Sequence, residues 1–369
     1  MEKLLPEVCD IQYGYAFDSA KFSADQGIPL IRIRDVVRGF SETYTTEVCD
    51  QEYIVNNGDI LIGMDGEFNI ARWKGGKAYL NQRVCRLLPK DEVDAMYLYY
   101  FMPKALKAIE DKTPFVTVKH LSAKELNKIV VPVPTINEQK AIANSLQKID
   151  DIISLRKQQL AKLDELVKAR CVELFGDPQT NPNGYEQAKL SDIATYFNGL
   201  TYKPENVAEA GTIVLRSSNI QNSQLDFDDT VRVDCTVKEK LMVQENDILM
   251  CSRNGSARLV GKVALIKGIK EPMTFGAFMM IIRSRYYSYL MTYFRMDAFR
   301  HQIKTGATTT INQITGRMLD EVIIPLPPME LVEQFAAFVE QTDKSKSAIQ
   351  QSLDKLETLK KALMQKYFG

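Results

Sequence analysis

One segment of this chain occurs twice, and this duplication limits the folds that the sequence can adopt. Residues 116–176 match the residues 193 positions later, 309–369, without a gap. Each copy has a Pro-x-Pro motif after an apolar run, then a long helical pattern and a closing Phe-Gly. Identical pairs include Thr117/Thr310, Leu126/Leu319, Asp150/Asp343, Leu160/Leu353, Leu163/Leu356 and Lys168/Lys361. A fixed offset over about sixty residues indicates an internal duplication, so we interpret the chain as two related halves.

The repeated helical pattern has the heptad spacing of a coiled coil. In the first copy the stripe comprises Leu146, Ile153, Leu160, Val167 and Leu174, with Ile149 and Leu163 beside it. In the second copy it comprises Val339, Lys346, Leu353, Lys360 and Tyr367, with Ile349, Leu356 and Leu363 beside it. Each helix is apolar partly where the other is charged, which favours pairing of the two helices with each other. The alternative is two separate amphipathic helices, each lying on its own domain.

Helix-breaking residues place the predicted boundaries. Pro132 and Pro134 cannot lie inside a helix, so they mark an extended segment before it. Asn137 is the predicted N-cap of a helix that begins near Glu138. A second run rich in breakers, residues 177–184, follows the first helix. We therefore predict a globular domain over residues 1–137, a long helix over 138–176, a second globular domain over 177–330 and a second long helix over 331–369.

The two globular regions share an outline although they share little sequence. Predicted strands are 28–34, 60–63 and 83–88 in the first region, and 213–215, 248–250 and 278–283 in the second; helices are predicted to begin at Tyr97 and Tyr289. The predicted fold class is α+β. Two mixed α/β globular domains alternate with two long helices that pair as an antiparallel coiled coil, and a pseudo-two-fold repeat relates the halves.

Composition excludes several classes of function. Lys and Arg number 47 and Asp and Glu number 47, so net charge alone predicts neither nucleic-acid nor membrane binding. Six dispersed cysteines without a C-x-x-C pair, and only two histidines, predict free thiols and no metal site. The sequence has no 18-residue apolar run and no signal-peptide pattern at Met1, which predicts a cytoplasmic protein without a membrane span.

Catalytic motifs are also missing from the sequence. Residues 181–185, Asn-Pro-Asn-Gly-Tyr, only superficially match the Asn-Pro-Pro-Tyr motif of amino-methyltransferases. No glycine-rich loop for S-adenosylmethionine and no Walker A lysine loop for ATP accompany them. We therefore expect that this chain is not an enzyme and binds no cofactor itself.

The predicted architecture has a physical consequence. A helix of roughly 35 residues is about 50 Å long, which exceeds one turn of B-DNA, about 34–36 Å. Two different domains held at that separation would read a target in two parts.

The order of motifs resembles that of the specificity subunits of type I restriction–modification systems. The resemblance is carried by residues 246–249 followed by 252–255 (Ser-Arg-Asn-Gly), by 305–308 (Thr-Gly-Ala-Thr) before Ile311, and by 324–328 before the second helix. In the first copy Glu138-Gln139 follows the prolines. The resemblance covers essentially the whole chain. The first half departs from the pattern, because residues 64–67 read Met-Asp-Gly-Glu and residues 112–115 read Lys-Thr-Pro-Phe, which places two acidic residues in a loop expected near DNA.

The resemblance implies a function in phage defence. The two globular regions would be target recognition domains that each read one half of an asymmetric, split sequence in double-stranded DNA. The paired helices would set the spacer and dock two methylation subunits of a DNA adenine methyltransferase complex, which restriction subunits can join. S-adenosylmethionine and ATP would then be bound by those partner subunits. The helix residues assigned to pairing and docking are Leu146, Ile153, Leu160, Leu163, Val167, Leu353, Leu356 and Leu363.

The candidate DNA-binding residues lie in polar loops beside predicted strands. Arginine suits bidentate contact with guanine and asparagine with adenine, whereas a solvated loop or a surface ion pair is the alternative at each position. The candidates are Ser252, Arg253, Asn254, Arg216, Asn219, Lys203, Thr308 and Gln313 in the second half, and Arg32, Arg34 and Tyr15 in the first. Trp73 is interpreted as a residue at the edge of the core.

A second interpretation belongs to a different class of function. A specificity-like decoy that occupies methylation subunits without supporting modification would have much the same sequence. The acidic loop at 65–67 favours this alternative. Replacing Arg253 and Asn254 by alanine separates the two, because a DNA reader would lose one half-site whereas a decoy would keep its effect on its partners.

Overall fold

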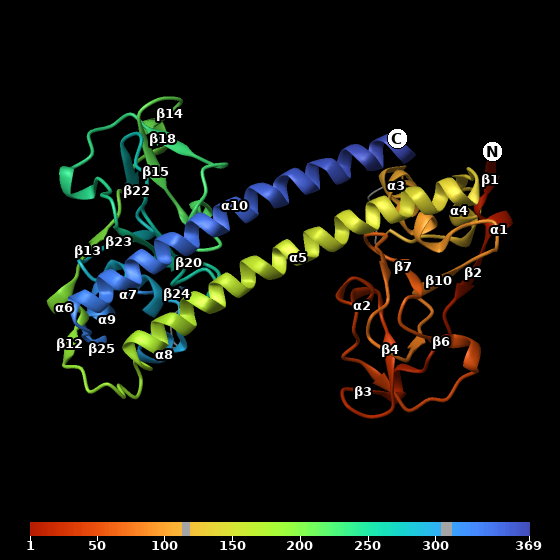
Figure 1. Cartoon of the computed structure of the whole chain (residues 1–369), viewed down its shortest axis with the longest axis horizontal. Helices are drawn as coiled ribbons and strands as arrows, with labels where there is room; N and C mark the ends of the chain where they lie inside the picture. Colours follow the sequence, from red (N-terminus) through yellow and green to blue (C-terminus); the bar gives the residue numbers. More distant parts are fainter. Residues whose placement is uncertain (113–118, 304–311) are drawn as a thin grey trace. The chain divides into compact units, whose positions relative to one another are not determined.

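A computed structural model describes residues 1–112, 119–303 and 312–369 of the chain (Figure 1). These residues form two compact units. Unit 1 comprises Met1–Lys157 and Gln351–Gly369, and unit 2 comprises Gln158–Gln350. Each unit therefore contains one globular region and half of each long helix. The predicted four-segment division, which treats the helices as segments of their own, stays a prediction.

Unit 1 is built on a four-stranded sheet of order β2-β10-β7-β8, a second sheet of order β3-β5-β4-β9-β6, and a separate β1-β11 pair. Neighbouring strands are antiparallel except β4 and β9, which are parallel. The elements are β1 (Glu2–Leu4), α1 (Leu5–Val8), β2 (Cys9–Tyr13), η1 (Ser19–Lys21), β3 (Phe22–Ser23), β4 (Ile28–Ile31), α2 (Ile33–Arg38), β5 (Tyr44–Thr45), η2 (Gln51–Tyr53), β6 (Ile54–Val55), β7 (Ile60–Gly63), β8 (Ile70–Arg72), β9 (Ala78–Leu80), β10 (Val84–Pro89), α3 (Ala95–Lys112), α4 (Ala123–Leu126) and β11 (Val130–Pro132).

Unit 2 repeats this plan. Its central sheet has the order β13-β23-β19-β21, its second sheet the order β14-β18-β15-β22 with β15 and β22 parallel, and β12 pairs with β25 as β1 pairs with β11. The duplication therefore extends to the globular regions. The elements are β12 (Gln187–Lys189), α6 (Leu190–Ile193), β13 (Thr195–Asn198), η3 (Pro204–Asn206), β14 (Val207–Ala208), β15 (Thr212–Leu215), η4 (Ser217–Asn219), β16 (Ile220–Gln221), β17 (Gln224–Leu225), β18 (Val231–Val233), η5 (Glu239–Leu241), β19 (Ile248–Cys251), β20 (Arg253–Asn254), β21 (Val263–Leu265), β22 (Met273–Phe275), β23 (Met279–Arg283), α7 (Tyr287–Tyr293), α8 (Asp297–Gln302), β24 (Asn312–Gln313), α9 (Gly316–Asp320) and β25 (Ile323–Pro325).

The central strand of each unit is apolar throughout because both of its faces are buried. In β7, Ile60 and Ile62 pack with the helices of unit 1, whereas Leu61 faces the second sheet. In β19, Ile248 and Met250 face the helices and Leu249 and Cys251 face the second sheet. Side chains alternate between the two faces of a strand, so four consecutive apolar residues supply two cores at once. The predicted strands at 60–63 and 248–250 are confirmed.

Glycine is required at one crossing in each unit. A Cβ atom on Gly14 would lie 2.1 Å from the carbonyl oxygen of Asn81, and one on Gly199 would lie 2.1 Å from that of Gly276. The residues that follow, Tyr15 and Leu200, then form parallel bridges with Asn81 and Gly276. The same close approach of two backbones therefore occurs in both halves.

The long helices are α5 (Ile136–Phe175) and α10 (Met329–Phe368), each of 40 residues. The prediction that Asn137 caps α5 is wrong, because Asn137 lies inside the helix. Thr135 is the cap: its hydroxyl accepts the Glu138 N–H at 3.4 Å, and the Glu138 carboxylate accepts the Thr135 N–H at 2.9 Å. At the other end, Gly176 has a φ of 76°, the left-handed conformation that commonly ends a helix.

Within each unit, α5 and α10 pack against each other and run in opposite directions. In unit 1, Leu146 shares a core with Phe368 and Asp150 forms an ion pair with Lys360 at 2.6 Å. In unit 2, Asp164 pairs with Lys346 at 2.8 Å. The two lysines that interrupt the apolar stripe of α10 are therefore neutralised by aspartates of α5. Among the residues assigned to pairing, Leu146, Ile153, Val167 and Leu353 are buried and Leu160, Leu163, Leu356 and Leu363 are half-buried.

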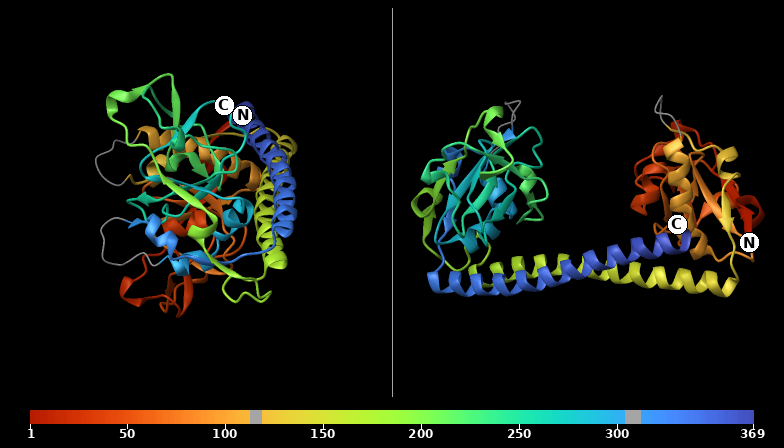
Figure 2. Two further views of the ribbon diagram at one scale, coloured as in Figure 1. Left: turned by 90° about the vertical axis from the view of Figure 1, so that its left-hand side faces the viewer. Right: turned by 90° about the horizontal axis from the view of Figure 1, so that it is seen from above.

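The globular part of each unit, taken by itself, lies to one side of the long helices (Figure 2). The last residues of the two helices anchor them there. Phe175 packs on Tyr289 and Phe335 in unit 2, and Phe368 packs on Tyr97 and Phe101 in unit 1. The repeated Phe-Gly is thus a repeated attachment point.

Two further predictions can be compared with the structure. The strand expected over residues 28–34 ends at Ile31 and gives way to α2, so Arg32 and Arg34 are not strand residues. The Asp35 carboxylate explains the difference, because it accepts the Arg32 N–H at 2.9 Å and so starts a helix. Trp73 is fully buried and its Nε1 donates to the carbonyl oxygen of Gly76, which places it deeper in the core than expected.

All six cysteines are free thiols, as expected. Burial raises the pKa of Cys9, Cys85 and Cys171 to about 12, so these thiols stay protonated. Within residues 1–112, 119–303 and 312–369, no group of three or more His, Cys, Asp and Glu side chains is placed to hold a metal ion. In the same ranges, no helix is both long and apolar enough to cross a lipid bilayer.

Candidate nucleic-acid interface

A cleft of about 480 Å³ in unit 2 gathers several of the predicted residues. Its walls come from the loop after β13, the turn after β15, the short strand β20 and the turn before β23. The predicted residue Lys203 is not itself a lining residue, but it directly follows the lining residue Tyr202. The lining residues are Leu200, Thr201, Tyr202, Arg216, Ser217, Ser218, Asp229, Arg253, Asn254, Gly276, Ala277, Phe278 and Met279. Three predicted DNA-binding residues, Arg216, Arg253 and Asn254, therefore line one cleft although Arg216 is far from the other two in sequence.

Arg253 is held in a defined orientation. Strand β20 pairs with β24, which places Arg253 opposite Gln313. The guanidinium donates from Nη2 and Nε to the Gln313 side-chain oxygen at 2.8 and 3.2 Å, and it lies 5.9 Å from the ring centre of Phe278. Phe278 is 59% exposed. The cleft therefore offers an oriented cation beside an exposed aromatic ring, a combination that suits phosphate or base contact.

Asn219 and Ser252 hold the loops of this cleft and are not free to reach a ligand. Asn219 is 0% exposed. Its Nδ2 donates to the backbone oxygens of Asp226 and Asp229 at 2.8 and 2.9 Å, and its Oδ1 accepts the Arg216 N–H at 2.8 Å. The Ser252 hydroxyl donates to the Phe278 backbone oxygen at 3.0 Å. A direct DNA contact by either side chain would require these turns to open, so we reassign both residues to positioning.

Arg216 is only partly available for a ligand. Its Nη2 donates to the Asp229 carboxylate at 2.7 Å at the cleft wall. Asn254 donates weakly to the Ser217 hydroxyl at 3.5 Å, and its Oδ1 accepts the Ser256 N–H at 3.0 Å. Both side chains line the cleft, so their contact with DNA stays a prediction. Thr308 lies outside the described residues.

Unit 1 repeats the turn that precedes the cleft wall. The Arg32 N–H is accepted by buried Asp35 as the Arg216 N–H is accepted by Asn219. Arg32 and Arg34 are exposed, and Arg34 donates to the Thr43 hydroxyl at 3.3 Å. Tyr15 packs edge-on against Phe17 and also lies against Tyr53, with ring centres 4.9 and 5.4 Å apart. The two arginines are therefore accessible, whereas the Tyr15 ring is partly committed to aromatic packing.

The acidic loop of unit 1 is not an isolated negative charge. Asp65 is 15% exposed. Its carboxylate accepts hydrogen bonds from Arg83 Nη1 at 2.8 Å and from His120 Nδ1 at 2.6 Å. Because the arginine alone compensates the aspartate, this loop carries no unpaired charge at Asp65. Glu67, the other acidic residue of this loop, is exposed.

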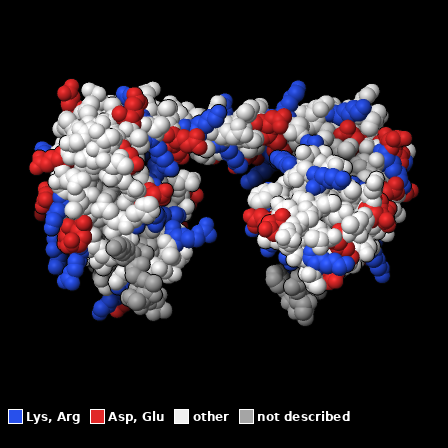
Figure 3. Space-filling view, turned by 90° about the horizontal axis from the view of Figure 1, so that it is seen from below, with Lys and Arg blue, Asp and Glu red and all other residues white. Residues whose placement is uncertain are grey.

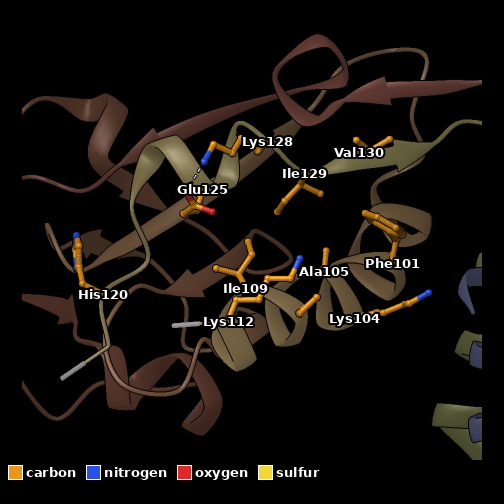
Figure 4. A pocket seen from close by; sticks show the side chains of 11 residues that line it. Phe101, Lys104, Ala105, Ile109, Lys112, His120, Glu125, Lys128, Ile129 and Val130 are labelled. Atoms are coloured by element: carbon orange, nitrogen blue, oxygen red, sulfur yellow. Dashed lines mark hydrogen bonds and ion pairs between the residues drawn. The ribbon is translucent and has the colours of Figure 1, made fainter. Parts of the chain in front are cut away.

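Unit 1 also contains a larger hollow, of about 700 Å³, between α3, α4 and β11 (Figure 4). Its walls are mostly apolar, with Phe101, Ile109 and Ile129 among them. Two of its lysines have protein partners: Lys104 donates to the backbone oxygen of Phe368, and Lys128 pairs with Glu125 at 2.7 Å. None of the predicted DNA-binding residues lines this hollow, so we do not assign the DNA site to it.

Charged side chains of both signs occur on the surface of each unit. On the face shown in Figure 3, basic and acidic side chains are interspersed on both units. The described residues on this face (Figure 3) therefore form no extended basic surface.

Sequence reasoning missed two residues of this region, Arg83 and Phe278. The predicted strands 83–88 and 278–283 include both residues, but β10 begins at Val84 and β23 at Met279, which leaves Arg83 and Phe278 in the turns before these strands. They were missed because the loops of the two halves differ in length, and a single offset of 193 does not align them.

Comparisons with known proteins agree with the internal repeat. A model of the family described as "Type I restriction modification DNA specificity domain" matches residues 1–165 and again residues 182–360. The Type I restriction enzyme EcoBI specificity subunit of Escherichia coli is 26% identical over 99% of this chain and 84% of its own length. The MjaVIII specificity subunit of Methanocaldococcus jannaschii is 23% identical over 91% of this chain and 87% of its own length.

Two solved structures share the fold. The S subunit of a type I restriction-modification system from M. genitalium aligns over 100% of this chain and 96% of its own, with a TM-score of 0.62 and 16% identity. A chain from a study of assembly and conformational transition of the type I R-M system aligns over 100% of this chain and 97% of its own, with a TM-score of 0.55 and 17% identity.

Proposed function

Because the chain belongs to the family of type I restriction-modification DNA specificity proteins, we propose that it selects the DNA target of such a complex. Unit 1 and unit 2 each read one half of an asymmetric, split sequence in double-stranded DNA. The observation that carries this proposal is the repeated scaffold: the central sheets have equivalent strand orders, the second sheets share four strands, and the residue after the parallel strand β4 or β15 has its N–H capped by a side chain three residues later, yet different side chains fill the loops. One scaffold with two sets of loop side chains is suited to two different half-sites.

The long helices set the distance between the two half-sites in this proposal. Each helix has 40 residues, which corresponds to about 60 Å of helix. The opposed directions and the Asp150–Lys360 and Asp164–Lys346 pairs support an antiparallel coiled coil of the two helices. Each aspartate–lysine pair forms in one register only. A shift of one helix by one turn along the other would therefore leave charged side chains unpaired between the helices.

The same helices dock two methylation subunits, which restriction subunits can join. Large apolar side chains that remain exposed on the helices support a protein-binding surface: Ile152, Leu155, Leu166, Val172 and Leu359. This chain is the non-catalytic subunit, and S-adenosylmethionine and ATP are bound by its partners in the cytoplasm. Family membership and the catalytic motifs that the sequence lacks support these assignments.

The balanced charge of the chain predicts how it binds DNA. With 47 basic and 47 acidic residues, the isolated chain should bind DNA weakly, and partner subunits would neutralise many of the phosphates. Fluorescence anisotropy with a labelled duplex that contains the methylated motif would show specific, salt-dependent binding only when methylation subunits are present. Tight specific binding by the chain alone would contradict this division of labour.

The alternative function, a decoy that occupies methylation subunits, is tested by the double variant Arg253→Ala, Asn254→Ala. If the chain reads DNA, the complex should still assemble, but methylation should lose sequence preference in one half of the motif only. A decoy would give no motif with or without the substitutions. Pairing of Asp65 with Arg83 and His120 compensates one of the two acidic residues in the loop at 65–67 and therefore weakens the support that this loop gives to the decoy.

A further inference from the structure

Two clusters of three side chains occupy equivalent backbone positions in the two units. In unit 1, the Met64 N–H donates to the Arg83 oxygen at 3.0 Å and the Leu121 N–H donates to the Met64 oxygen at 2.7 Å. In unit 2, the Ser252 N–H donates to the Phe278 oxygen at 2.9 Å and the Ile314 N–H donates to the Ser252 oxygen at 2.7 Å.

The residues that follow Met64 and Ser252 are paired in the same way. Asp65 bridges to His120, and Arg253 bridges to Gln313. Asp65 therefore corresponds to Arg253, Arg83 to Phe278, and His120 to Gln313. We call these the unit 1 cluster (Asp65, Arg83, His120) and the unit 2 cluster (Arg253, Phe278, Gln313).

The arginine stands at a different backbone position in each cluster. In the unit 2 cluster the arginine stands after the central strand, and the aromatic ring stands before the neighbouring strand. In the unit 1 cluster an aspartate takes the arginine's position, and the arginine takes the position of the aromatic ring. Each cluster therefore contains one arginine, but Arg253 follows the central strand β19, whereas Arg83 precedes β10, the strand beside the central strand β7.

In each cluster a hydrogen-bond acceptor orients the arginine. Gln313 accepts from Nε and Nη2 of Arg253, and Asp65 accepts from Nη1 of Arg83. In the described part of the chain, Nη1 is the one Arg83 donor with a protein acceptor, so Nε and Nη2 form a free edge. The side chains of Arg83 and His120 are 54% and 53% exposed, whereas Asp65 lies beneath them at 15%. The carboxylate also holds the proton on His120 Nδ1, because a carboxylate accepts and the ring nitrogen must donate.

We propose that Arg83 is the specificity-determining arginine of unit 1 and that Asp65 is its positioning residue. Arg83 thus has the role of Arg253, although it stands at the backbone position of Phe278. This inference rests on the proposed function. The free Nε–Nη2 edge of Arg83 is a bidentate donor that matches the two acceptors on the major-groove edge of guanine. A guanidinium fixed by a half-buried carboxylate loses less side-chain entropy on binding than a mobile one, so the acidic residue strengthens DNA reading and does not oppose it.

The test compares methylated motifs in cells that express the methylation subunit with the intact chain or with one variant of it. Arg83→Gln removes the charge and the bidentate edge. Asp65→Asn keeps a hydrogen-bond acceptor but removes the charge that fixes Arg83. Arg72→Gln is the matched control, because Arg72 is an exposed arginine on β8 of the same unit and lies outside the cluster.

With Arg83→Gln, the preference at one base pair of one half-motif should fall roughly 10- to 100-fold, while the other half-motif stays unchanged. Asp65→Asn should relax the same base pair to a smaller extent, whereas a merely structural loss would lower methylation evenly over the half-site. Arg253→Gln should relax a base pair in the opposite half-motif, and Arg72→Gln should change nothing.

An unchanged motif with Arg83→Gln, or an even loss over both halves, would overturn the assignment of Arg83 while the split motif of the intact chain still supports the proposed function. If the intact chain directs no motif, the proposed function fails, and this inference fails with it.

Discussion

The two phenylalanines that end the long helices should stabilise different parts of the molecule. Phe175 is 2% exposed in the core of unit 2, with ring centres 5.0 Å from Tyr289 and 5.3 Å from Phe335. Phe368 is 6% exposed in the core of unit 1, with ring centres 5.4 Å from Tyr97 and 6.0 Å from Phe101. Phe175→Ala should therefore destabilise unit 2, and Phe368→Ala should destabilise unit 1.

The magnitude follows from the cavity that each substitution leaves. Truncation of a buried phenylalanine to alanine costs about 3–5 kcal/mol, and each aromatic pair contributes about 0.5–1.5 kcal/mol of that. Phe175 continues into a chain that is fixed on both sides, so its cavity cannot collapse and the cost should be near 5 kcal/mol. Phe368 is the penultimate residue, where the helix end can shift into the space, and the cost should be near 3 kcal/mol.

Hydrogen exchange read by mass spectrometry separates the two units. Peptides that contain β7 report on unit 1 and peptides that contain β19 report on unit 2. A loss of about 3 kcal/mol should accelerate exchange from the fully protected amides of the affected unit by roughly a hundredfold. Each variant serves as the control for the other. Equal acceleration of both strands by either variant would refute the assignment of one phenylalanine to each unit.

Two further predictions concern Gly199, where two backbones approach closely, and the Asp164–Lys346 ion pair between α5 and α10. Gly199→Ala should destabilise the protein by about 1–3 kcal/mol in chemical denaturation, because the added methyl group meets the Gly276 carbonyl, whereas Gly255→Ala, which has open space, should be neutral. Burial raises the pKa of Asp164, but the hydrogen bond from Lys346 and nearby positive charge outweigh it and lower that pKa below its usual range. A lowered carboxyl pKa gives stability that is present above the unfolded pKa and is lost as pH falls through the folded pKa. Lys346→Met should therefore destabilise unit 2 at neutral pH and differ little from the intact protein below the folded pKa of Asp164. An equal difference in stability at every pH would contradict this linkage.

Much of the architecture was predictable because periodicity and duplication are local properties of the sequence. The heptad stripe predicted both long helices, and the apolar runs at 60–63 and 248–250 predicted the central strands. The repeated Phe-Gly marked the ends of both helices. These signals were reliable because burial of a strand on two faces, or of one stripe of a helix, leaves a direct mark on the sequence.

The errors have equally local causes. The alternation in Ile31-Arg32-Ile33-Arg34 fits a strand, but Asp35 caps the segment and starts a helix. Two polar residues precede Glu138 as possible caps, and the Thr-x-x-Glu spacing selects Thr135 over Asn137. A capping carboxylate three residues into a helix therefore outweighs a short alternating pattern.

The candidate site was only partly predictable from the sequence. Arg253 stood out because it follows a buried strand in a polar loop. Asn219 fits the same description, yet its amide holds three backbone groups inside the turn. Arg83 became recognisable only through its contact with Asp65, which lies 18 residues away in sequence. Pairings of this kind depend on how loops fold back onto strands, and a single sequence does not record them.

The central claim is that this chain directs methylation to a split DNA sequence. It is tested most directly by methylome sequencing of cells that express the chain with its neighbouring methylation subunit. We expect methylated adenines in one asymmetric motif of two specific parts separated by a spacer of fixed length, and loss of that motif when the chain is deleted. Exchange of residues 177–308 for those of a relative should change one half of the motif only. A methylome that is the same with and without the chain would contradict the account.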